Sequence, residues 1–126
     1  AAAALAVLHR VLRDDLTARA AVLGERLLAG LRSLGHHRFY WDARGKGLLA
    51  GLEIVRDRES GEDFPDRLAA GNALRIAARE RGLTTLLLHP GNVLFVAPAV
   101  VATEEQIDRM VAILDDALGD VERELT

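Results

Sequence analysis

The sequence has no cysteine, and it has only one lysine, Lys46, against 15 arginines. The absence of cysteine excludes disulfide bonds and thiolate metal sites, and it is consistent with the cytoplasm, where we expect the protein to reside. The shortage of lysine limits the chemistry further. Any reaction of this chain that requires a lysine amine must use Lys46.

Long apolar runs and an excess of positive charge are also missing. The 16 basic and 19 acidic residues are mixed along the chain and give a net charge of −3, so no basic surface for nucleic acid is predicted. No run of about 18 apolar residues occurs, and residues 1–12 lack the cationic flank of a signal peptide. We therefore expect neither a nucleic-acid partner nor a membrane partner.

Aromatic residues make up only 4% of the chain, whereas half of all residues are hydrophobic. The core must therefore consist mostly of Leu, Val, Ile and Ala. A length of 126 residues is typical of one domain.

Apolar residues recur at steps of three and four in the first part of the chain, which predicts one long helix over residues 1–35 that ends at Gly35. The chain opens on four alanines, with no Ser, Thr, Asp or Asn to cap the free N–H groups. We therefore expect a helix truncated at its start, and the alternative is a naturally frayed terminus. Its apolar stripe consists of Leu5, Leu8, Leu12, Leu16, Ala20, Leu23, Leu27, Leu31 and Leu34.

An alternation with a period of two indicates a strand over residues 48–55, after the aromatic run 39–41 and the glycine-containing segment 44–47. Leu49 and Val55 lie on the second face, so we expect that face to be partly buried too. The main apolar face consists of Leu48, Ala50, Leu52 and Ile54.

A second helix is predicted from a cap at Asp63 to about Arg81, with Pro65 in its first turn. Small residues on its apolar side would allow close packing. That side consists of Leu68, Ala69, Ala73, Ile76 and Ala77.

Two short strands, 83–88 and 93–97, follow and are joined by the turn 89–92. A capping box at Thr103–Gln106 then opens the last helix. The buried stripe expected for this helix consists of Ile107, Met110, Val111, Leu114, Leu118, Val121 and Leu125.

The predicted order is helix, strand, strand, helix, hairpin, helix. It indicates an α/β fold of the α+β type, in which a small, mostly antiparallel sheet packs against a long N-terminal helix and two further helices. We expect one domain over residues 1–126, with the helix at 1–35 and the sheet-and-helix portion at 39–126.

Three blocks resemble the C-terminal portion of class III aminotransferases, the group of the ornithine, 4-aminobutyrate and omega-amino acid transaminases. The first is AAAALAVL at 1–8, leading into LGERL at 23–27. The second is RGKGLLAGLE at 44–53. The third and most specific is PGNVLFVAPAVV at 90–101, followed by TEEQID at 103–108. The resemblance covers nearly the whole chain.

The resemblance implies a pyridoxal-phosphate-dependent transaminase that moves an amino group between an amine or amino acid and a keto acid. Members of the family are homodimers in which a large domain holds the cofactor and its Schiff-base lysine. The small domain closes the active site. Residues 1–126 would be that small domain, with the large domain and a second subunit as partners.

Lys46 is not expected to be the catalytic lysine. A Schiff-base lysine needs a desolvated pocket, whereas Lys46 lies between two glycines in a charged segment. The matching lysine of the family is not catalytic either. We therefore expect a surface or loop role for Lys46, and no catalytic or cofactor-binding residue in this chain.

The resemblance points to His89 and Phe95 as substrate-binding positions. Arginine usually binds substrate carboxylates, because its planar fork matches two oxygens. Many omega-amino acid transaminases have an arginine where this chain has His89, and ornithine-type members often have one at the position of Phe95. His89 is either a weaker carboxylate donor or a turn histidine without a ligand. Phe95 is a pocket wall or a core residue.

Two adjacent histidines, His36 and His37, raise the question of a metal site. Because no cysteine is present and the carboxylates are scattered along the sequence, we expect no metal there. Two alternatives to a transaminase domain stay open. One is a free-standing, non-catalytic α/β module that dimerises through its first helix, and the other is part of an aminomutase of the same family.

Overall fold

The computed structural model describes all 126 residues and confirms the mixed α/β fold. The order of helices and strands is the predicted one, except that the first helix is divided in two. The elements are α1 (Ala2–Arg13), α2 (Leu16–Ser33), the 3-10 turn η1 (Leu34–His36), β1 (Tyr40–Lys46), β2 (Leu49–Ile54), α3 (Arg67–Glu80), β3 (Leu86–Leu88), β4 (Val93–Val96) and α4 (Glu104–Leu125). None of these helices is long and apolar enough to span a membrane.

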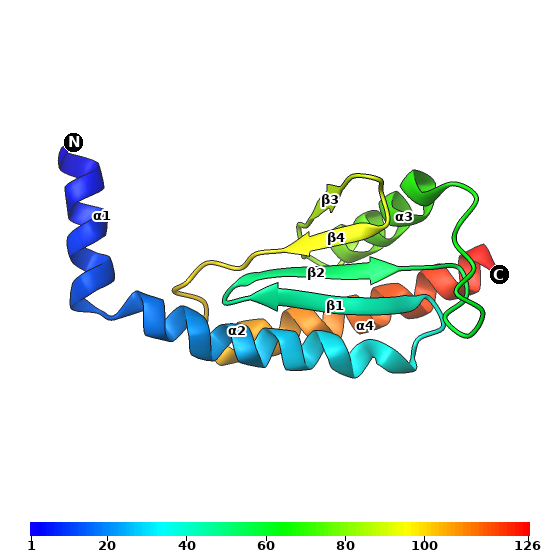
Figure 1. Cartoon of the computed structure of the whole chain (residues 1–126), viewed down its shortest axis with the longest axis horizontal. Coiled ribbons are helices and arrows are strands. Elements are labelled where there is room, and N and C mark those ends of the chain that lie inside the picture. Colours follow the sequence, from blue (N-terminus) through cyan, green and yellow to red (C-terminus); the bar gives the residue numbers. More distant parts are fainter.

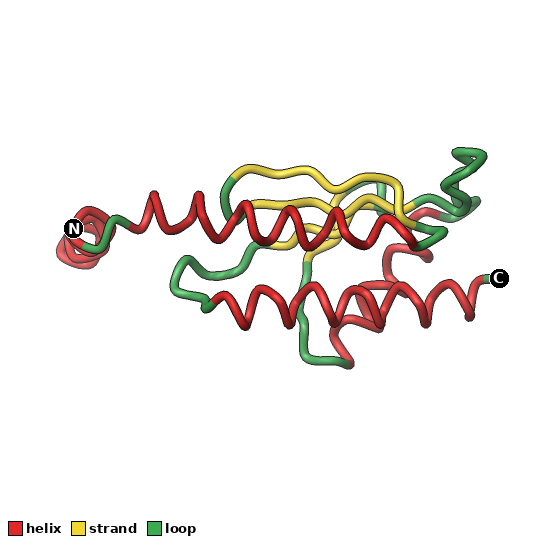
Figure 2. The backbone as a smooth tube through the Cα atoms, turned by 90° about the horizontal axis from the view of Figure 1, so that it is seen from below, coloured by secondary structure: helices red, strands yellow, loops and turns green.

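The four strands form one antiparallel sheet in the order β1-β2-β4-β3, which confirms the expected antiparallel pairing (Figure 1). Helices α2, α3 and α4 lie on one side of this sheet, and no helix covers the other side (Figure 2). Helix α4 packs against both α2 and α3. The architecture therefore has two layers, with one sheet face closed and the other open.

The core lies between the sheet and the helices. The predicted inward face of β2 is confirmed, because Leu48, Ala50, Leu52 and Ile54 are all buried. Val55 is also buried, as expected. The expectation for Leu49 is wrong, since 59% of it is exposed. Leu49 points to the open face of the sheet, where it has no helix to pack against.

The single helix expected over residues 1–35 is in fact two helices. The chain breaks at Asp14 and Asp15, and Asp15 adopts a left-handed conformation with φ 47° and ψ 50°. Aspartate is one of the few residues that visit this region readily, and it is a poor helix former. Helix α1 buries no residue and projects away from the rest of the fold (Figure 1). The first third of the predicted apolar stripe is therefore exposed.

Helix α3 begins later than predicted and faces the sheet with other residues. Its N-cap is Asp66, not Asp63, because the side chain of Asp66 accepts a hydrogen bond from Ala69 N at 2.9 Å. Pro65 therefore precedes the helix. The predicted apolar side is largely wrong, since Leu68 and Ile76 are exposed. Small residues meet the hairpin closely at this interface, and the buried positions are Ala70, Gly71, Leu74 and Ala78.

Helix α4 follows its prediction closely. The capping box is formed, with Gln106 N donating to Thr103 Oγ1 at 3.1 Å and Thr103 N donating to Gln106 Oε1 at 2.9 Å. The expected stripe is buried or partly buried except at Leu125, which is 43% exposed in the last position of the helix.

Each hairpin end rests on a glycine of a helix. The turn after β1 contains Gly47 at φ 55° and packs on Gly24 of α2. The turn after β3 contains Gly91 at φ 113° and packs on Gly71 of α3. A Cβ atom at Gly24 or Gly71 would overlap the carbonyl group of the turn above it. These two contacts fix the sheet against the helices and place the turn that carries His89.

Candidate functional site

The β3–β4 turn, residues 89–92, is held firmly at its C-terminal end. Asn92 is only 4% exposed, and its Nδ2 donates to Ile54 O at 3.2 Å. The backbone reinforces this contact, because Ile54 N donates to Asn92 O at 2.9 Å. His89, at the other end of the turn, is exposed and makes no hydrogen bond within the chain. The fold therefore presents the His89 ring to a ligand or to another part of a protein.

His89 lies on the wall of a surface pocket of about 550 Å³ between α3 and β3. Asn72, Arg75 and Thr85 line the same pocket. Arg75 donates from Nε and Nη2 to Asn72 Oδ1 at 3.2 and 3.1 Å, so the guanidinium is held in place. Thr85 Oγ1 is buried without a partner in the chain. A cation and an imidazole next to an apolar wall can bind a small organic anion.

Sequence reasoning found His89 but missed Arg75 and Thr85. Arg75 is one of 15 arginines, and nothing in its local sequence distinguishes it from an exposed helical arginine. Thr85 lies in a short strand region without a motif. Only the packing of α3 beside β3 brings these two side chains to the pocket of His89.

Phe95 lies on the open face of the sheet and not in the pocket of His89. It is partly buried, and it pairs with Gly51 of β2 and Leu86 of β3. Residues directly opposite each other in a sheet share a face, so the side chain of Phe95 lies next to Gly51, which has no side chain. The structure therefore does not bring His89 and Phe95 into one pocket. Phe95 is a wall residue of the open face.

The open face is charged at β1 and mostly apolar across the other strands of the sheet. Leu49 and Leu86 are exposed by 59% and 62%. Arg44 donates from Nη1 to Glu53 Oε2 at 2.7 Å and to Asp42 Oδ2 at 3.1 Å. These hydrogen bonds, first to Glu53 and then to Asp42, raise the pKa of the Arg44 guanidinium. Its carboxylate partners thus lie within its own sheet.

Lys46 is the last residue of β1 and is exposed. Its ladder partner is Leu49, at the tip of the β1–β2 hairpin. This position is a surface strand end, which agrees with the role expected from the sequence.

The chain matches one protein family. The family model described as aminotransferase class-III matches residues 1–118. A taurine–pyruvate aminotransferase of Bilophila wadsworthia is 39% identical over 128 residues, which cover 97% of this chain and 28% of that protein. A leucine/methionine racemase of Thermococcus litoralis is 35% identical over 121 residues, which cover 95% of this chain and 26% of that protein.

Solved structures of transaminases share the fold. A transaminase obtained by ancestral reconstruction superposes with a TM-score of 0.92 at 34% identity, over 99% of this chain and 28% of that chain. The chain therefore spans little more than a quarter of the length of the relatives and structures that it matches.

Proposed function

The chain belongs to the class III aminotransferase family, and on that basis we propose that residues 1–126 form the C-terminal small domain of a pyridoxal-phosphate-dependent transaminase. The parent enzyme moves an amino group between an amine or amino acid and a keto acid. The observation that carries this proposal is the family match over residues 1–118, joined to coverage of only 28% of the relatives' length. A full transaminase needs more residues than this chain supplies.

The residues of this chain do not fit a covalently held cofactor. Schiff-base formation requires an uncharged lysine amine, which a desolvated pocket favours. The one lysine here, Lys46, is exposed at a hairpin end. We therefore assign pyridoxal phosphate to the large domain of the same enzyme, where it supplies the electron sink for the reaction when bound.

The open sheet face supports a role against that large domain. Exposed apolar residues that form a continuous patch usually mark an interaction surface. Leu49, Leu86, Leu88 and the partly buried Phe95 form such a patch on adjacent strands. We assign this face to the large domain, the assembly to a homodimer and the location to the cytoplasm.

His89 and Phe95 are the substrate-binding residues of this proposal. The support for His89 is its exposed ring, free of partners, in a pocket that also holds Arg75. Phe95 supplies an apolar wall on the open face of the sheet, outside the pocket of His89. In these roles the small domain orients the substrate and excludes water, and it leaves the proton transfers to the large domain.

An isomerase of the same family is the second candidate. The 35% identity to a leucine/methionine racemase supports it. The two reactions differ in one requirement, since a transaminase needs a keto acid acceptor and an isomerase does not. Turnover of an amino acid in the absence of any keto acid would favour the isomerase.

Replacing Lys46 with alanine in the full-length enzyme is expected to leave transaminase kcat/KM within about threefold, because Lys46 is exposed at a hairpin end and has no role in the chemistry of this proposal. The rate is measured with a keto acid acceptor. The matched control is alanine at the lysine that borohydride reduction labels with pyridoxal phosphate, and it should abolish turnover.

Two results would contradict the assignment of the cofactor to the large domain. One is a loss of turnover in the Lys46→Ala enzyme. The other is a stoichiometric, borohydride-reducible adduct of pyridoxal phosphate at Lys46 in the 126-residue chain alone.

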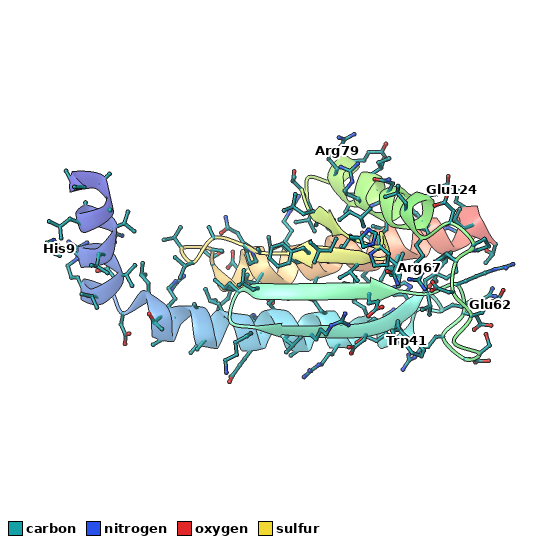
Figure 3. All side chains as sticks on the ribbon, turned by 45° about the horizontal axis from the view of Figure 1, so that its top comes forward. His9, Trp41, Glu62, Arg67, Arg79 and Glu124 are labelled. Atoms are coloured by element: carbon teal, nitrogen blue, oxygen red, sulfur yellow. The ribbon has the colours of Figure 1, made fainter.

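Replacing His89 with arginine in the full-length enzyme is expected to raise the kcat/KM ratio of a dicarboxylic to a monocarboxylic keto acid by roughly tenfold, because arginine binds carboxylates through two parallel hydrogen bonds. The control is His9→Arg, which adds the same group on α1, away from the pocket (Figure 3). An unchanged ratio in His89→Arg would remove His89 from the substrate site.

A further inference from the structure

His36 and His37, at the end of η1, meet a carboxylate of α4. His36 Nε2 lies 3.2 Å from Asp115 Oδ1, and His37 Nε2 lies 2.5 Å from the same oxygen. The three residues offer ligand atoms that all lie within 4.8 Å of one another. Two imidazoles and one carboxylate therefore converge on a single point.

The opposite nitrogen of each ring is already engaged. His36 Nδ1 lies 3.0 Å from Ser33 O, a backbone oxygen that can only accept a hydrogen bond. His37 Nδ1 lies 3.2 Å from Glu122 Oε2, and Glu122 Oε1 in turn accepts the backbone N–H of Phe39 at 2.9 Å. His36 therefore carries a proton on Nδ1, whereas His37 has a carboxylate oxygen at each ring nitrogen, and these contacts do not fix its tautomer. Backbone carbonyls and carboxylates are the usual partners of the outer nitrogen of metal-binding histidines.

These contacts bring hydrogen-bond acceptors together without a donor between them. With its proton on Nδ1, the His36 ring has a lone pair at Nε2, and the Asp115 oxygen that it faces also has only lone pairs. Two acceptors that face each other require a positive charge or a proton between them. A metal ion or added protons on the rings would meet this requirement.

We propose that His36 Nε2, His37 Nε2 and Asp115 form a binding site for a divalent transition metal, with Zn²⁺ as the best match. Two imidazoles with one carboxylate favour zinc and its neighbours over Mg²⁺ and Ca²⁺, which take oxygen ligands. Bonds of about 2.0–2.1 Å in tetrahedral geometry place ligand atoms about 3.3 Å apart. His36 is already at this spacing from Asp115, and a small shift of the His37 ring would bring it there.

Solvent can reach the site, because the side chains of His36 and Asp115 are 62% and 46% exposed. Both histidines line a pocket of about 610 Å³ that faces solvent. The two arginines of this pocket have other partners within the chain. Arg38 lies 4.0 Å from Asp57, and Arg58 lies over the ring of Tyr40 at 5.5 Å. Water can therefore complete the coordination, as in other three-ligand zinc sites.

The ion would tie the turn after α2 to the middle of α4. This inference does not rest on the transaminase proposal, because it uses only contacts within the chain. It also departs from the expectation that His36-His37 has no carboxylates at hand. Asp115 and Glu122 are 78 and 85 positions from His37, and only the packing of α4 beside α2 brings them to it.

The test is a titration of the metal-free chain with Zn²⁺ by calorimetry and with Co²⁺ by visible absorption. One equivalent should bind at neutral pH, Co²⁺ should show the intense bands of four-coordination, and the melting temperature should rise. His36→Ala is the main variant, because the side chain of His36 is 62% exposed and its loss should not unfold the chain. Asp115→Asn is the second, since it keeps the shape of the carboxylate.

His9→Ala and His89→Ala are the matched controls, because these are the other two histidines of the chain. Binding should fall at least tenfold in His36→Ala and Asp115→Asn and stay unchanged in the controls, with circular dichroism confirming the fold of each variant. The proposal is overturned if the chain binds no Zn²⁺ or if binding survives both site variants. A loss in a control variant would overturn it too, because the ligands would then lie elsewhere.

Discussion

Replacing Gly71 with alanine is expected to destabilise the chain by about 3 kcal/mol or more, among the largest effects of any single methyl group here. Gly71 lies in α3 directly beneath Gly91, and an added Cβ would overlap the Gly91 carbonyl group as well as Leu87. The turn cannot retreat easily, because Asn92 fastens it to Ile54. Urea unfolding followed by circular dichroism measures the loss.

The matched control for this prediction is Gly119→Ala in α4. A Cβ there would meet only Arg123 Nη1 at 3.4 Å and His37 Cε1 at 3.9 Å, and the arginine can move aside. Since alanine is a better helix former than glycine, this variant should gain up to about 1 kcal/mol. If both variants lost the same stability, the proposed fit between helix and turn would be refuted.

Replacing Phe39 with alanine should cost about 3–5 kcal/mol of unfolding free energy, because a large and fully enclosed side chain leaves a cavity. Phe39 is 1% exposed, and its ring packs edge-on against Phe64 with centroids 4.9 Å apart. It also anchors the start of the sheet, since its backbone N–H donates to Glu122 Oε1 of α4. The measurement is the urea midpoint together with the m-value.

Trp41→Ala is the control for Phe39→Ala. Trp41 is two residues away and larger, but it is 46% exposed on the surface of the sheet (Figure 3). The Trp41→Ala variant should lose less than about 1.5 kcal/mol of unfolding free energy, because much of the Trp41 side chain already faces water. Equal losses of unfolding free energy in the two variants would mean that burial does not determine how much each aromatic residue stabilises the fold.

Much of the fold could be predicted because local patterns and tertiary packing agree. The alternation at residues 48–54 needs one buried face, and the sheet has one face covered by helices. The capping box at Thr103–Gln106 is satisfied within four residues, so it does not depend on the rest of the chain.

Other features depended on contacts that no local pattern reveals. The spacing of the leucines predicted one continuous helix through Asp15. In the structure, the segment before Asp15 has no core to pack on. The face of α3 was misjudged for a related reason. Hydrophobic size favoured Leu68 and Ile76, whereas the close approach of the hairpin selected Gly71 and the alanines.

The candidate sites show the same limit. His89 could be found because its neighbours resemble a known turn, while Arg75 reaches that pocket only through the docking of α3 on β3. The cluster at His36 and His37 includes Asp115, which lies 78 positions after His37 in the sequence. Sequence patterns of fixed spacing cannot detect such a combination.

Helix α1 joins α2 at Asp14 and Asp15 and has few contacts with it. Its 12 residues bury nothing. A peptide helix of about this length is marginal in water, so its order responds to solvent and temperature independently of the core. We therefore expect two thermal transitions. Helix α1 unfolds gradually at lower temperature, and the sheet and the other three helices melt cooperatively at higher temperature without a contribution from α1.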